Sequence, residues 1–132
     1  MGGGLAHLLE LPGKIKLSRE EYRTVQQIYR GWALLGIAVV GALIATTALA
    51  FLEDGSGPAV YVSFVAPICV ALSLVVFFSV TFPVNRITHN WSVLPAGWET
   101  LRRRWEFSHA ASAALYLVAL IALAISMAAP QP

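Results

Sequence analysis

Three long apolar stretches, all free of Lys, Arg, Asp and Glu, constrain this chain more than any other feature of its sequence. They run over 31–52, 59–82 and 107–129, and each exceeds the ~20 residues that a helix needs to cross about 30 Å of hydrocarbon. Lipid cannot solvate unpaired backbone groups, and the stretches do not alternate as barrel strands do, so each is predicted to be a helix. The sequence therefore predicts an integral membrane protein.

The composition agrees with burial in lipid rather than in a soluble core. Of the 132 residues, 58% are hydrophobic and 12% are charged, about half the charged share that is usual in soluble domains. A soluble domain of this size keeps much of its surface in water and could not cover so much apolar area. The net charge of +2 is too small to indicate a nucleic-acid partner.

The distribution of basic residues predicts the orientation in the membrane. Five of the nine Lys and Arg residues precede the first stretch, namely Lys14, Lys16, Arg19, Arg23 and Arg30. The other four, Arg86 and Arg102–Arg104, lie between the second and third stretches, whereas the first connection is short and acidic. The positive-inside rule then makes both basic segments cytoplasmic and the C-terminus external, in a plasma or inner membrane.

Local signals give the helix boundaries. We expect one membrane domain over 1–132, with helices 4–12, 19–52, 59–88 and 96–129, cytoplasmic connections 13–18 and 89–95, and an outer hairpin 53–58. Ser18 and Glu21 fit a capping box, and Pro67 is expected to kink the third helix. Trp98 and Trp105 are seven residues apart, which suits the interfacial aromatic belt.

The first of these helices is too short to span a bilayer at 1.5 Å per residue, so it is expected to be a half-helix or a truncated one. The fold class that follows is all-α, a transmembrane helical bundle of three full spans plus a short N-terminal helix. Its arrangement is expected to resemble a four-helix bundle.

Polar side chains gather near the predicted cytoplasmic boundary. His7 and Glu10 are three residues apart on the short first helix, so they share a face. Glu106 and His109 have the same spacing at the start of the last span, and Asn85 follows the second span. Ionisable groups near hydrocarbon usually face a bundle interior or a cavity. We therefore expect these side chains to form one polar pocket.

Two interpretations of this pocket stay open at the level of sequence. Glu-x-x-His pairs from two helices resemble the ligands of di-iron carboxylate bundles, and mixed His and carboxylate ligands suit Fe, Mn or Zn. A haem between the two histidines is less favoured, since the chain has no haem motif. Alternatively, Glu106 pairs with Arg102 one turn earlier and His109 bonds locally, which would leave no site.

Two segments carry a family resemblance. The more specific one comprises Phe82-Pro83-Val84-Asn85-Arg86, Trp91, Pro95, Trp98-Glu99, Leu101-Arg102-Arg103-Arg104-Trp105-Glu106 and His109-Ala110; the other comprises 6–14 and 25–29. Together they resemble the anthrone oxygenase-like family of small integral membrane proteins, many of which are called a domain of unknown function. The resemblance implies a four-helix membrane bundle and, in some members, oxidation of polycyclic aromatic anthrones to quinones with dioxygen.

Two functions follow as hypotheses. The first is a metal-dependent oxygenase that acts on a hydrophobic aromatic or quinone-like substrate entering from the lipid bilayer. Its metal ligands would be His7, Glu10, Glu106 and His109, and its other catalytic residues Asn85 and Trp105. The second is a non-catalytic accessory or scaffold subunit that docks on a membrane partner protein or on another copy of the chain.

Overall fold

The computed structural model describes residues 2–53 and 58–128, and every regular element in these ranges is a helix. Three helical runs are long and apolar enough to cross a membrane, namely Trp32–Leu52, Val60–Ile87 and Trp98–Ala128. A shorter helix, α1 (Gly2–Lys14), precedes them. The predicted all-α fold of three spans and a short N-terminal helix is thus confirmed. Residues 54–57 of the predicted outer hairpin and residues 129–132 lie outside the described ranges.

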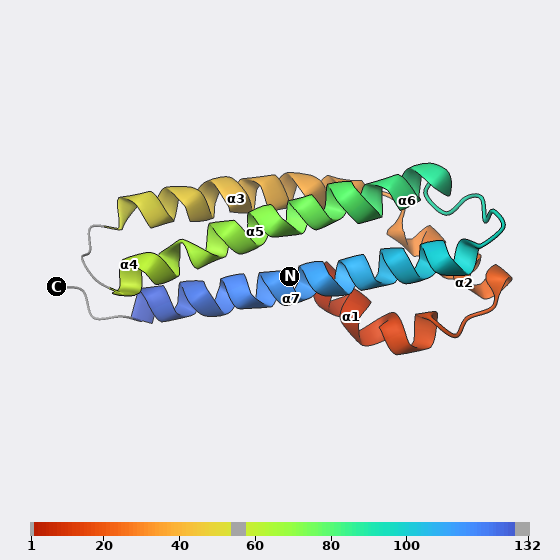
Figure 1. Ribbon diagram of the computed structural model, residues 1–132, viewed down its shortest axis with the longest axis horizontal. Coiled ribbons are helices and arrows are strands. Elements are labelled where there is room, and N and C mark those ends of the chain that lie inside the picture. The colour runs from red at the N-terminus through yellow and green to blue at the C-terminus, as the bar shows by residue number, and fades with distance from the viewer. Residues whose placement is uncertain (1, 54–57, 129–132) are drawn as a thin grey trace.

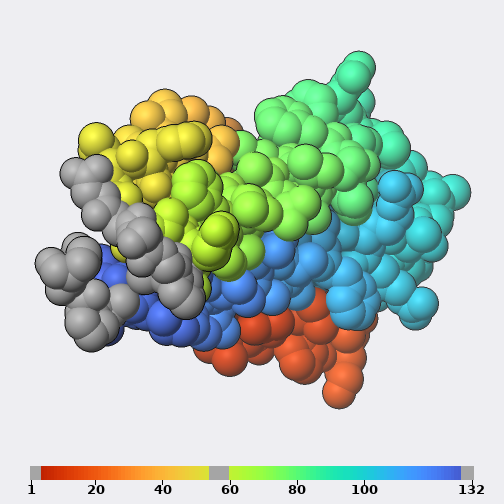
Figure 2. Space-filling view, turned by 60° about the vertical axis from the view of Figure 1, so that its left-hand side comes forward, coloured from red at the N-terminus to blue at the C-terminus, as the bar shows by residue number. Residues whose placement is uncertain are grey.

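The long helices α3 (Leu35–Leu52), α5 (Val65–Val76) and α7 (Trp98–Ala128) run side by side (Figure 1). Both α3 and α7 pack against α5, and α1 packs against α7 on the side away from α3 (Figure 2). Gly4 makes the close approach of α1 possible, because a Cβ atom there would lie 3.3 Å from the Cβ of Ala113. The short N-terminal helix therefore occupies the fourth place of the bundle over part of its length.

The predicted continuous helix 19–52 is divided in the structure. It consists of α2 (Arg19–Gln26), the 3₁₀ turns η1 (Gln27–Tyr29) and η2 (Trp32–Leu34), and α3. Arg30 is extended, and Gly31 has a φ of 88°, a conformation that glycine adopts without steric cost. The prediction of one helix here is wrong, and the bend brings Tyr29 and Trp32 against α1. The capping box of Ser18 and Glu21 is present as predicted.

Proline positions explain the irregular course of the second span. It consists of α4 (Pro58–Ser63), α5, the π-helical η3 (Phe77–Thr81) and α6 (Phe82–Ile87). Pro67 has no N–H to offer the carbonyl one turn earlier, and the helix is interrupted at Phe64, in agreement with the predicted kink. Pro83 follows the π turn, in which the Phe82 N–H bonds to the Phe77 carbonyl five residues back.

The core has two parts. One lies among the spans and is built from small residues, with Ala66, Cys69, Val70 and Ala119 at its centre. The other, here called the aromatic cap, consists of Tyr22, Val84, Trp91, Leu94, Trp98 and Trp105. The prediction that Trp98 and Trp105 form an interfacial belt is wrong, because they are only 8% and 4% exposed. They pack against α2 and the loop after α6 instead of facing lipid.

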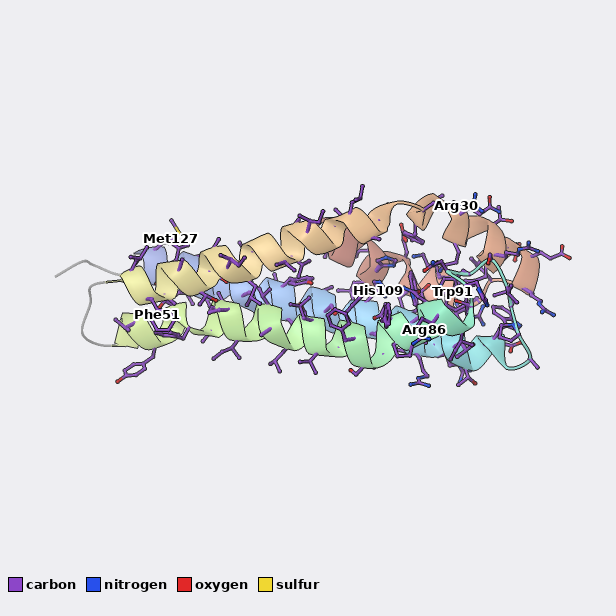
Figure 3. The ribbon with its side chains drawn as sticks, turned by 90° about the horizontal axis from the view of Figure 1, so that it is seen from above. Arg30, Phe51, Arg86, Trp91, His109 and Met127 are labelled. Carbon is purple, nitrogen blue, oxygen red and sulfur yellow. The ribbon has the colours of Figure 1, made fainter. Side chains whose placement is uncertain are left out.

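All basic segments meet at one end of the bundle, which we call the basic end. The C-terminal end of α1, all of α2, the end of α6 and the start of α7 lie there (Figure 1). Arg30, Arg86 and Trp91 mark this end among many nitrogen and oxygen atoms, whereas Phe51 and Met127 mark the other end (Figure 3). Along the spans many apolar side chains are exposed, including Ile37 and Leu49, which is compatible with contact to lipid.

Candidate functional site

A buried network of titratable side chains connects α1 and α7 at the basic end. Glu106 of α7 is 0% exposed, and its Oε2 lies 3.9 Å both from His7 Nδ1 and from Lys14 Nζ of α1. Lys14 Nζ lies 3.1 Å from His7 Nδ1, because residues seven apart share a helix face. The Tyr22 hydroxyl of α2 donates to Glu106 Oε1 at 3.0 Å. Oε2 of Glu106 has no hydrogen-bond partner among the described residues.

Lys14 extends this network towards solvent. Its Nζ lies 2.7 Å from Glu10 Oε2, and it also donates to the Tyr29 hydroxyl. Tyr29 in turn donates to the same Glu10 oxygen at 2.8 Å. Lys14 is buried whereas Glu10 is exposed, so a single ammonium group links a solvent-facing carboxylate to the enclosed carboxylate of Glu106.

Aromatic rings enclose the His7 imidazole. It stacks on Tyr29 with ring centroids 4.6 Å apart, and it meets Trp32 and Trp105 edge-on at 5.7 Å and 5.0 Å. The ring of His109 lies 4.4 Å away. The bend between α2 and α3 supplies Tyr29 and Trp32, and α7 supplies Trp105 and His109. The His7 imidazole is therefore packed among planar rings from the bend and from α7.

The two predicted catalytic residues lie in the same place. Trp105 Nε1 donates to Asn85 Oδ1 at 2.8 Å, and this bond fixes the indole beside His109, whose ring centroid is 4.0 Å away. His109 Nδ1 lies 2.8 Å from the Trp105 carbonyl. Since a carbonyl only accepts, Nδ1 carries the proton and Nε2 is the acceptor nitrogen. Figure 3 shows His109 in the half of the bundle that leads to the basic end marked by Arg86 and Trp91.

Burial and hydrogen bonding shift the pKa values of groups on α1 and α2. The pKa of His7 is lowered from 6.5 to about 3 by burial first, then by His109 and Lys14, against the opposing effect of Glu10. The imidazole is therefore neutral at pH 7, and Nδ1 accepts from the Lys14 ammonium, which can only donate. The hydrogen bond from Lys14 lowers the pKa of Glu10. Burial, followed by Glu106, raises the pKa of the Tyr22 hydroxyl.

The residues of the site do not fit a resident metal ion. Over residues 2–53 and 58–128, no three His, Cys, Asp or Glu side chains are arranged to hold one. The Lys14 ammonium already lies among three of the four predicted ligands, His7, Glu10 and Glu106, so a metal would have to displace it. The geometry thus gives the metal interpretation no support. A haem fits no better, because the rings of His7 and His109 are in contact.

The structure brings together the predicted pairs, His7 with Glu10 and Glu106 with His109. Four further residues of the site are not among the predicted ones, namely Lys14, Tyr22, Tyr29 and Trp32. For Lys14 the sequence pattern predicts only a role in topology. The seven-residue spacing of His7 and Lys14 is the signal that could have found it, had the helix been extended past Pro12. Tyr22 and Tyr29 are also seven residues apart, and both belong to the network at the basic end.

Arg102 has a structural role that its prediction as an orientation signal did not include. It is buried, it donates to the Leu17 carbonyl at 2.6 Å, and it lies 4.6 Å from the centroid of the Trp98 ring. Its neighbours Arg103 and Arg104 are exposed. The first arginine of the run therefore holds the chain between α1 and α2 against α7.

Exposure differs across the site. His7, Lys14 and Glu106 are almost completely covered, whereas Tyr29, Trp32, Asn85 and His109 are half-buried. The half-buried residues therefore form the more accessible side of the site.

No model of a known protein family, no curated protein and no solved structure matches this chain. The resemblance to the anthrone oxygenase-like family therefore stays a prediction. Fold and site define a small all-helical protein whose apolar spans are compatible with a membrane and whose basic end holds a buried acid–base network. That network is the candidate functional site of the protein.

Proposed function

We propose that the protein oxidises a hydrophobic aromatic or quinone-like substrate, and that its buried network performs the proton transfer in that reaction. One observation supports this most strongly: Glu106 is fully enclosed, yet its Oε2 has no hydrogen-bond partner in the described part of the chain. A buried polar atom without a partner is rare and calls for an explanation. The absence of a partner is explained if Oε2 accepts a proton from a bound substrate.

Each neighbour then has a role that follows from its chemistry. Glu106 accepts the proton at Oε2, the carboxylate oxygen that has no hydrogen-bond partner among the described residues. The ammonium of Lys14 compensates the negative charge that the departing proton leaves on the substrate. Tyr22 holds the other carboxylate oxygen, and the rings of Trp105 and His109 stack on the substrate. Asn85 positions Trp105.

The resemblance suggests an anthrone as substrate, and the reaction is balanced without a further reductant. Glu106 removes one proton from the CH₂ group of the anthrone, and the carbanion adds to dioxygen. The proton returns from Glu106 to the distal oxygen, which gives a hydroperoxide. Loss of the remaining C–H proton and cleavage of the O–O bond leave a C=O group and release water. Dioxygen thus accepts the four electrons, with one oxygen atom in the quinone and one in water.

The proposal includes an orientation and a source of substrate. The basic end faces the cytoplasm of a plasma or inner membrane, because Lys and Arg are retained on that side. The substrate is a hydrophobic small molecule that reaches the half-buried side of the site from the bilayer. A nucleic-acid partner is not part of this proposal.

Oxygen uptake tests the proposal directly. The full chain is purified in detergent, supplied with anthrone, and followed by dioxygen consumption and quinone absorbance. We expect equal amounts of dioxygen used and quinone formed, and a fall in kcat/KM of about 100-fold or more in Glu106→Gln, the range for loss of a general base. Glu99→Gln, an exposed carboxylate in the first turn of α7, is the matched control and should retain activity.

Two outcomes would contradict this function. One is a wild-type rate no greater than that of anthrone in buffer and detergent alone, which would favour the accessory-subunit hypothesis. The other is an active Glu106→Gln variant, which would remove the network from the chemistry.

A further inference from the structure

A groove at the basic end lies apart from the buried network. It runs between the α2–η1 segment and the loop after α6, and its lining includes Arg23, Gln26, Arg30, His89 and Trp91. Its volume of about 160 Å³ is several times the ~30 Å³ that one molecule takes up in liquid water. The groove can therefore hold a group of several heavy atoms.

Two residues that line this groove each carry a buried hydrogen-bond donor with no partner in the described part of the chain. The donors are Gln26 Nε2 and Trp91 Nε1, and both residues are only 4% exposed. The Gln26 amide also lies beside the Tyr22 hydroxyl, but it has two N–H groups, so at least one stays free. An indole N–H can only donate. Both groups require an acceptor, because unpaired buried donors destabilise a fold.

The charge of the groove indicates what kind of acceptor fits. Arg23 and Arg30 contribute exposed guanidinium groups, and in the described chain no Asp or Glu is among the side chains that line it. Glu20 lines only the neighbouring groove, together with Arg19 and Arg23. Donors and positive charge without a carboxylate select an anion over a cation or a neutral group.

The loop that carries Trp91 is held in an unusual conformation. His89, Asn90 and Trp91 have φ angles of 48°, 53° and 63°, which residues other than glycine rarely adopt. The hydroxyl of Thr88 accepts from the Trp91 backbone N–H at 3.1 Å. The indole ring packs against Tyr22 and Trp105. Its position at the wall of the groove is therefore fixed by the aromatic cap.

We propose that this groove binds a phosphate group, with Gln26 and Trp91 donating to its oxygens and Arg23 and Arg30 neutralising its charge. The phosphate has two possible sources, an anionic lipid headgroup or a soluble phosphorylated molecule. The groove lies at the end where α6 and α7 leave the apolar spans, so a headgroup is within reach. The proposal is independent of the oxidation chemistry, since it uses none of its residues.

Binding measurements on the detergent-purified full chain test this site and distinguish the sources. One arm titrates inorganic phosphate and pyrophosphate while thermal unfolding is recorded. The other compares nanodiscs of phosphatidylcholine with nanodiscs that contain phosphatidylglycerol, and native mass spectrometry counts the retained lipids. We expect a rise in Tm or retention of the anionic lipid in at least one arm. Arg23→Ala/Arg30→Ala should weaken binding about tenfold or more, given the strength of charge-assisted bonds.

The control is Arg103→Ala/Arg104→Ala, which removes the same charge from exposed residues at the same end that do not line the groove. Both double variants change surface residues, so folding should be retained. A third variant, Trp91→Phe, removes the indole N–H and should weaken binding without a change in charge. Absence of binding in both arms would overturn the proposal. Equal losses in the two double variants would also overturn it, because they would show diffuse attraction rather than a site.

Discussion

The two ends of the bundle use different interactions although the same long helices build both. Away from the basic end, among the spans, small residues pack closely, and the described polar contacts are few, such as the Ser126 hydroxyl donating to Glu53 Oε1 at 2.9 Å. At the basic end, an ammonium, a carboxylate and an imidazole are buried together under a cap of aromatic rings. Buried charges are costly unless they are paired, so the chain concentrates that cost in one place.

The two kinds of packing have different consequences for function. Packing of small residues is sufficient to associate helices in lipid. A buried titratable network adds little net stability and is retained where it has work to do or a conformation to specify. The spans therefore serve as a scaffold, and the basic end is where substitution should have the greatest effect.

Removal of the central ammonium should have the largest effect on stability. Lys14→Met leaves the carboxylates of Glu10 and Glu106 without their shared cation, and we expect a loss of about 3 kcal/mol in the free energy of unfolding. Lys16→Met, two residues away and exposed, should change it by less than about 0.5 kcal/mol. Chemical denaturation in detergent measures both. Equal effects would mean that Lys14 acts only as a surface charge.

The same contrast shows what could be predicted from sequence. The spans, their helical state and the meeting of all basic segments at one end follow from what a bilayer imposes on any chain. The site was predictable as far as the spacing of His7 with Glu10 and of Glu106 with His109. Lys14 was missed because the first helix was predicted to end at residue 12, whereas α1 continues to Lys14 and so places it on the same face as His7. Its contact with Glu106 of α7 depends on the tertiary structure and has no signal in the sequence.

Two predictions made from local sequence are wrong because contacts with distant parts of the chain determine the structure there. The break at Gly31 interrupts a sequence with regular helical spacing, and the contacts of Tyr29 and Trp32 with His7 accompany that bend. Trp98 and Trp105 have the spacing of a lipid-facing belt, yet α2 and the loop after α6 cover them. Neither the break at Gly31 nor the burial of the two tryptophans can be predicted from the residues next to them in the sequence.

Removal of a tyrosine hydroxyl should affect stability at the basic end but not at the far end. Tyr22→Phe removes the hydroxyl that donates to the buried Glu106, and hydrogen bonds to charged groups contribute about 1.5–3 kcal/mol, so we expect a loss of about 2 kcal/mol. Tyr61→Phe, at a residue 78% exposed near the far end, should leave stability nearly unchanged. Thermal unfolding of the two variants provides the measurement. If Tyr22→Phe left the unfolding temperature unchanged, the stability of the fold would not depend on the hydrogen bond between Tyr22 and Glu106.

Acid should destabilise the basic end through His7. Its folded pKa of about 3 is below the unfolded value of 6.5, so the unfolded state binds more protons between these values. Stability contributed by the neutral imidazole is therefore present above pH 6.5 and is lost progressively as the pH falls towards 3. Unfolding measured from pH 7 to pH 5 should show a smaller decline in His7→Gln than in the wild type. Identical profiles would contradict the assigned burial of His7.

The smallest effect concerns the approach of α1 to α7. Gly4→Ala places a Cβ 3.3 Å from the Ala113 Cβ and 3.4 Å from its Cα, which cannot easily move, so we expect a loss of under about 1 kcal/mol. Gly41→Ala in α3 meets nothing within 4 Å and should stabilise its helix by about 0.5 kcal/mol. In thermal unfolding we expect Gly4→Ala to lower the Tm and Gly41→Ala to raise it. A stabilising Gly4→Ala would mean that α1 is not tightly seated.

The central claim is that Glu106 takes a proton from a bound aromatic substrate, and an infrared difference spectrum of binding tests it most directly. Anthrone is added to the purified protein without dioxygen, so that the reaction stops after proton transfer. We predict a new carbonyl band of a protonated carboxyl group that shifts in D₂O, is absent in Glu106→Gln and persists in Glu99→Gln. Binding of anthrone without such a band, or with the band retained in Glu106→Gln, would contradict the claim.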